Sequence, residues 1–149
     1  MTLTVYVVRP PFIDELDVVH AYERVYRAVP MATELWKLLG DEARAKELTA
    51  VTSAAFDHDP ARLESPNLER MLSLLEPLRA SVVGTLTDAD NKLSPARVVE
   101  LRASARTLDL DESRGPDAQW AVAEALHDID NLVEILRHAL AEGHCLVFN

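Results

Sequence analysis

Cysteine and glycine are scarce in this chain of 149 residues. The single cysteine, Cys145, excludes an internal disulfide bond and agrees with a reducing compartment. The four glycines lie where apolar-periodic segments stop or start, so none remains for a phosphate-binding loop. No run approaches the roughly 18 apolar residues of a membrane helix, and the first apolar stretch is too short for a secretory signal and has no basic residue before it. We therefore expect a cytoplasmic protein.

Catalytic and nucleic-acid-binding motifs are also missing. The sequence has no serine-hydrolase elbow, no zinc framework of cysteine and histidine, and no His-Glu-x-x-His helix. Aromatic residues make up only 5% of the chain and are not interleaved with basic clusters. The sequence thus predicts neither a cofactor nor a nucleic-acid partner, and an enzyme is disfavoured.

Composition and periodicity predict one helical domain over residues 1–149. The chain is 48% hydrophobic and 27% charged, as is usual for a compact globular protein. Apolar residues recur at helical spacing over residues 12–29, and again on both sides of Gly40, where Asp41 can cap the second piece. A further helix begins after Ser65-Pro66, and Pro77 should kink it or break it in two. Another is expected to follow Ser94-Pro95.

The last helix, after Pro116, gives the clearest pattern. Its apolar residues are spaced three or four apart and should form a core stripe, and Gly143 should end the helix. The stripe consists of Val122, Leu126, Ile129, Val133, Leu136 and Leu140.

Two segments resemble strands, one at each end of the chain. They are residues 3–8 and residues 145–148, and neither has another candidate neighbour. Unpaired strands leave backbone groups without hydrogen bonds, so we expect the two segments to pair with each other; one of them could instead be an open edge that pairs with another molecule. The predicted fold is therefore mainly α, a compact helical bundle of about five or six helices with a small two-stranded sheet formed by the terminal segments.

Negative charge is concentrated near the C-terminus. The net charge is −10, and residues 109–149 carry nine acidic residues against two basic ones, a net charge of −7. Such a surface repels phosphates and anionic lipid and attracts cationic proteins. The simplest interpretation is that these residues keep the protein in solution.

The functional interpretation of this charge is a binding protein without catalytic activity. In composition the chain is similar to the small acidic immunity proteins that neutralise bacterial toxins, and to other small inhibitors. A basic partner would be attracted by complementary charge. The candidate partner-binding residues are Asp109, Asp111, Glu112, Asp117, Trp120, Glu124, Asp128 and Glu134.

Two alternatives remain open. A helical enzyme or metalloprotein could use His127, His138, Asp57 and His58, since Glu124 and His127 have the Glu-x-x-His spacing of carboxylate-bridged metal sites. The polar stripe that contains them lies opposite the apolar stripe of the last helix, so we expect no bound metal. The third hypothesis is a self-associating structural protein with an open strand edge.

Overall fold

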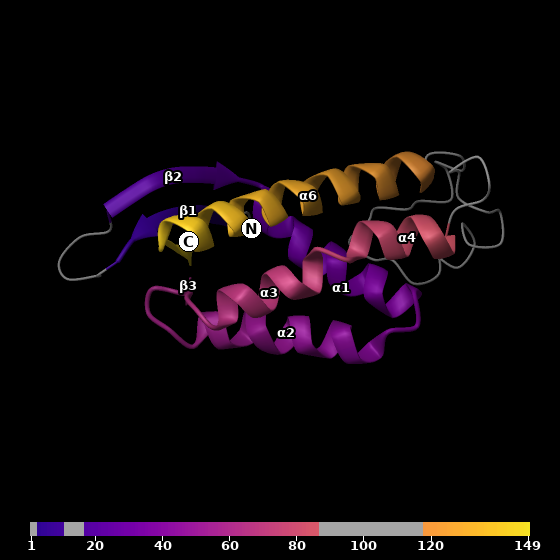
Figure 1. The fold of residues 1–149 in the computed structure, drawn as a ribbon, viewed down its shortest axis with the longest axis horizontal. Helices are drawn as coiled ribbons and strands as arrows, with labels where there is room; N and C mark the ends of the chain where they lie inside the picture. The colour runs from indigo at the N-terminus through magenta and orange to yellow at the C-terminus, as the bar shows by residue number, and fades with distance from the viewer. Residues whose placement is uncertain (1–2, 11–16, 87–117) are drawn as a thin grey trace.

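A computed structural model of the chain describes residues 3–10, 17–86 and 118–149, with side chains described over residues 3–10, 17–84 and 124–149. The described part contains a four-stranded antiparallel sheet and a set of helices that pack on it (Figure 1). The predicted helix after Ser94-Pro95 lies outside the described residues.

The sheet has the strand order β2-β1-β4-β3. Its strands are β1 (Thr4–Arg9), β2 (Asp17–Glu23), β3 (Arg62–Leu63) and β4 (Cys145–Phe148). The two ends of the chain pair as predicted, with Val5 opposite Phe148 and Val8 opposite Cys145. Both terminal strands lie inside the sheet, however, so its open edges are β2 and β3 and not the chain ends.

The predicted fold class is wrong, because the protein is not a bundle of five or six helices with a two-stranded sheet. Residues 17–23, expected within the first helix, form β2 and make an antiparallel hairpin with β1. The segment contains two valines and a tyrosine, residue types that suit a strand, and pairing with it satisfies the backbone of β1 on the side away from β4. Arg24, in the left-handed conformation at φ 66°, follows the strand.

The helices begin immediately after this turn. They are a short 3₁₀ helix η1 (Val25–Arg27), α1 (Ala28–Leu38), α2 (Glu42–Phe56), α3 (Asn67–Leu75), α4 (Leu78–Leu86) and α6 (Ala118–Glu142). Pro30, which directly follows the helix predicted over residues 12–29, lies instead in the first turn of α1, where its missing amide hydrogen costs nothing.

Three predicted helix boundaries are confirmed. The Asp41 side chain accepts a hydrogen bond from the Arg44 amide at 3.0 Å and so caps α2. The chain breaks between α3 and α4 at Pro77. Gly143 takes a positive φ of 70° directly after α6, a conformation that favours glycine and frees the chain to extend into β4.

The main core lies between the sheet and the helices. Val5, Val7, Leu146 and Phe148 point into it from the strands. From α6, the predicted stripe supplies the buried residues Leu126, Ile129, Val133 and Leu136. α1 and α3 contact both α2 and α6, and so separate these two helices (Figure 1). This packing fixes α6 above one face of the hairpin β1–β2.

Candidate functional site

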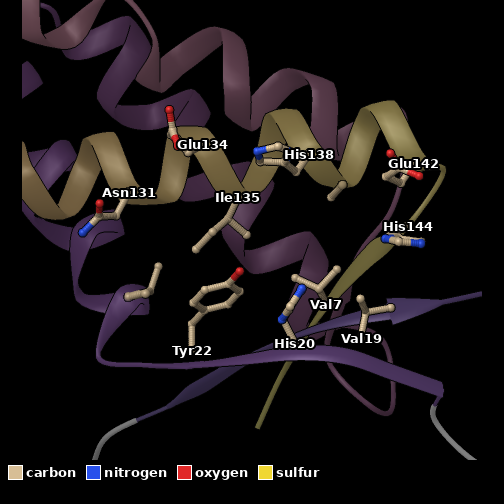
Figure 2. Close-up of a pocket in the computed structure, with 12 residues that line it drawn as sticks. Val7, Val19, His20, Tyr22, Asn131, Glu134, Ile135, His138, Glu142 and His144 are labelled. Carbon is tan, nitrogen blue, oxygen red and sulfur yellow. The ribbon is translucent and has the colours of Figure 1, made fainter.

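A cleft of about 550 Å³ lies between β2 and the C-terminal half of α6. Figure 2 shows side chains of the two elements facing one another across it, with the Tyr22 hydroxyl directed toward α6. Its lining combines an apolar floor with histidines and carboxylates at the rim. The lining residues are Val7, Val19, His20, Tyr22, Val25, Asn131, Glu134, Ile135, His138, Ala139, Glu142 and His144.

The alternation of side chains along β2 determines which of its residues line the cleft. His20 lies opposite Val7 and Tyr22 opposite Val5, and both valines point into the main core. Because cross-strand neighbours share a face, His20 and Tyr22 lie on the face of the sheet that α6 covers. Their rings are 6.0 Å apart. The pairing is irregular between Val7 and Val8, where Val19 is the extra residue and joins the lining.

The helical repeat of α6 determines which of its residues line the cleft. Its lining residues recur three or four positions apart and therefore share one face of the helix. Ile135 and Ala139 are buried, whereas Glu134, His138 and Glu142 are exposed. The polar stripe of the last helix is thus not wholly a solvated face, since Asn131, Glu134 and His138 are among the residues that line the cleft.

The charges around the cleft are unbalanced. No lysine or arginine is among its lining residues. Within the part of the chain that the structure describes, Glu134 and Glu142 form no ion pair. The other carboxylates of α6 do: Asp128 receives a hydrogen bond from Arg27 Nε at 2.8 Å, and Asp130 one from Arg79 Nε at 2.8 Å. Among the described residues, the carboxylates of Glu134 and Glu142 at the cleft therefore have no lysine or arginine partner.

The predicted partner-binding residues divide into three groups. Glu124 and Asp128 both lie against Arg27, at 3.4 and 2.8 Å, so an arginine of the same chain already pairs with them. Glu134 lies on the rim of the cleft. Trp120 belongs to the first turn of α6, but its side chain lies outside the described residues, as do Asp109, Asp111, Glu112 and Asp117.

The residues proposed for an enzyme or metal site do not come together. His138 lines the cleft, whereas His127 is exposed elsewhere on α6 and contacts the Asn131 amide at 3.4 Å. Asp57 and His58 are exposed in the loop between α2 and β3. Among the described residues, no group of three or more histidine, cysteine, aspartate or glutamate side chains is arranged to hold a metal ion.

Sequence reasoning missed the β2 half of the cleft. The helix predicted over residues 12–29 included His20 and Tyr22. The available signal was the alternation in "DVVHAYE", where positions 18, 20 and 22 point one way and 19, 21 and 23 the other in a regular strand. The same letters also fit helical spacing, so the signal was ambiguous.

Cys145 is a packing residue and not part of the cleft. It is 4% exposed, packs with Val8 and Val147, and its Sγ lies 3.6 Å from the Val8 carbonyl oxygen. Burial, assisted by the negative charge of Glu64, raises the pKa of this thiol from 9.0 to about 11. A protonated, buried thiol is a poor nucleophile.

This thiol gives a pH prediction. Below pH 9 the thiol is protonated in both the folded and the unfolded chain, and its contribution to stability is complete. Between pH 9 and about 11 only the unfolded chain releases the proton, so the free energy of unfolding should fall across this interval. Urea unfolding at pH 8 and at pH 10.5 measures the fall, and Cys145→Ala should make it smaller. Tyr26, whose pKa burial also raises, contributes in the same direction and is present in both proteins. An equal fall in the variant would contradict the assignment to Cys145.

No protein-family model, curated protein or solved structure matches this chain. Among the described helices, none is both long and apolar enough to cross a lipid bilayer.

Proposed function

We propose that the protein is a binding protein without catalytic activity, which receives cationic side chains of a basic protein partner in the cleft between β2 and α6. The observation that carries this proposal is the charge of the cleft: two glutamates at its rim, no lysine or arginine in its lining, and no ion pair to either glutamate from a described residue. A ligand that supplies the missing cation would be stabilised there.

The shape of the cleft suits a lysine or arginine side chain. Such a side chain has an apolar stem and a charged end, and it packs the stem on apolar surface while the end stays at a polar rim. The floor supplies Val7, Val19 and Ile135 for the stem. Glu134 and Glu142 lie eight residues apart on α6, so each supplies a carboxylate for a separate charged end, and the Tyr22 ring can stack with a guanidinium group.

The charge of the whole chain supports the same class of partner. A net charge of −10 draws a basic protein toward the surface and speeds encounter at low salt. An inhibitor of the immunity type would use this field to find a basic toxin and cover its active surface. The acidic segment that contains Asp109, Asp111, Glu112 and Asp117, together with Trp120, remains part of this proposal.

The charge of the cleft is tested with a pair of small ligands that differ only in charge. N-acetyl-arginine amide carries a guanidinium group, and N-acetyl-citrulline amide carries a neutral urea of the same shape. Titration followed by ¹⁵N NMR should show binding of the first alone, with shifts confined to the residues that line the cleft. The double variant Glu134→Gln, Glu142→Gln should weaken binding by up to about fivefold, because the single guanidinium forms one exposed ion pair, such a pair contributes up to about 1 kcal/mol, and 1.4 kcal/mol is a factor of ten.

A matched control removes a carboxylate elsewhere. Glu69 is exposed in the first turn of α3 and does not line the cleft, so Glu69→Gln should leave the affinity unchanged. Equal binding of the two ligands, or equal effects of the cleft and control variants, would contradict the proposal.

A further inference from the structure

The outer edge of β2 borders the cleft. β2 is the last strand of the sheet on this side, and five of its seven residues are exposed. Natural edge strands are usually blunted by lysine, proline or a bulge. β2 contains no lysine or proline, and its irregularity lies at Val19, near its start. The stretch from His20 to Glu23 is regular.

The hydrogen-bond pattern identifies the backbone groups that point outward. Thr4 and Asn149 exchange both backbone hydrogen bonds, at 2.8 and 3.0 Å, so the N–H and C=O of Thr4 point toward β4. Because these directions alternate along a strand, the groups of Val5 and Val7 point toward β2. Their partners Tyr22 and His20 use their own groups to bond β1. The N–H and C=O of Ala21 and Glu23 therefore point away from the sheet.

We propose that the basic partner adds an extended segment to this edge as a fifth strand, with basic side chains at alternate positions entering the cleft. The inference rests on the proposed function and adds the mode of recognition. Main-chain hydrogen bonds to Ala21 and Glu23 supply affinity, and the cleft selects the alternate side chains. These side chains project from the same face as His20 and Tyr22, which is the face that α6 covers.

Charge favours this occupant over a second copy of the chain. Two copies would each carry a net charge of −10 and would repel one another. A segment with alternating arginine residues instead supplies the cations that the lining of the cleft lacks. One strand repeat spans two residues, about 7 Å, so two successive basic side chains of the segment can both lie along the cleft.

The test blocks the edge without disturbing the cleft. The Ala21 amide bonds nothing in the sheet, and proline is accepted in edge strands where the amide faces outward, so Ala21→Pro should fold. The matched control Ala21→Val keeps the amide. The probe is the peptide acetyl-Thr-Arg-Thr-Arg-Thr-Arg-Thr-amide, with N-acetyl-arginine amide as the ligand that needs no strand edge.

The expected result is a loss of peptide affinity of at least about tenfold in Ala21→Pro, since the variant removes a hydrogen bond and adds a steric block. Ala21→Val should bind the peptide as the natural chain does, and both variants should bind N-acetyl-arginine amide equally. Unchanged peptide affinity in Ala21→Pro overturns the added strand while the cationic cleft stands. Absence of N-acetyl-arginine amide binding to the natural chain overturns the proposed function itself.

A second experiment modifies the peptide and leaves the protein unchanged. N-methylation of alternate peptide amides blocks one edge of the peptide, and the complementary set blocks the other. One set should abolish binding and the other should not, and equal effects of both sets overturn the proposal. A concentration-dependent dimer in sedimentation that Ala21→Pro dissociates would instead identify a second copy of the chain as the occupant, and would also overturn it.

Discussion

Deletion of Cys145–Asn149 is expected to abolish cooperative folding. β4 lies between β1 and β3, so the deletion removes an interior strand and leaves two separate edges. All four residues of β4 are buried, and full burial of a large apolar side chain contributes roughly 1.5 to 3 kcal/mol. Leu146, Val147 and Phe148 together approach the 5 to 15 kcal/mol that stabilises a typical domain. The truncated protein should show no cooperative transition by circular dichroism on heating.

A graded control separates loss of the strand from a general sensitivity of this end of the chain. Phe148 is 4% exposed and its ring contacts Tyr26 and Phe56. Phe148→Leu keeps the strand and most of the apolar volume, so it should fold and lose less than about 1.5 kcal/mol. A truncated chain that still unfolds cooperatively near the melting temperature of the full chain would show that β1 does not need β4.

The sequence predicted the pairing of the ends but not the hairpin. The terminal strands had no other neighbour, so the requirement for backbone hydrogen bonds was enough to pair them. Val18, Tyr22 and Val25 are spaced four and three apart, which suits a helix, while the same segment also has the valines and tyrosine of a strand. Pairing with β1 decided between the two, and that contact is tertiary. β3, with two residues, was too short to give any pattern.

The sequence predicted the acidic character of the C-terminal segment but not the cleft between β2 and α6. The sequence places the acidic residues near the C-terminus, and Glu134 is one of the predicted partner-binding residues there. The sequence does not show which carboxylates already have partners, because Arg27 lies 101 residues before Asp128 and Arg79 lies 51 residues before Asp130. Only the packing of η1 and α4 beside α6 reveals that Asp128 and Asp130 have arginine partners and that Glu134 has none among the described residues. The cleft itself depends on β2, which the helical interpretation removed.

Trp36→Ala should cost 3 to 5 kcal/mol of stability, within the usual range for loss of a buried tryptophan. Trp36 is 1% exposed on α1 and links three helices. Its indole N–H donates to the Leu74 carbonyl oxygen of α3 at 2.9 Å, and the Arg44 guanidinium of α2 lies 4.7 Å from its ring centroid. Urea unfolding followed by circular dichroism measures the loss as a lower midpoint with an unchanged slope. Phe56→Ala is the aromatic control, since Phe56 is 44% exposed and should cost less.

Trp36→Phe separates the contribution of apolar packing from that of the indole hydrogen bond. Phenylalanine keeps most of the apolar contact but has no N–H, so the Leu74 carbonyl loses its donor. A buried acceptor without a partner costs about 1 to 3 kcal/mol, and the variant should fall between the natural chain and Trp36→Ala. Stability equal to that of the natural chain would mean that the hydrogen bond contributes nothing and that packing alone holds α1 against α3. Stability equal to that of Trp36→Ala would mean that the shape of the indole ring, with its contact to Arg44, accounts for the whole effect.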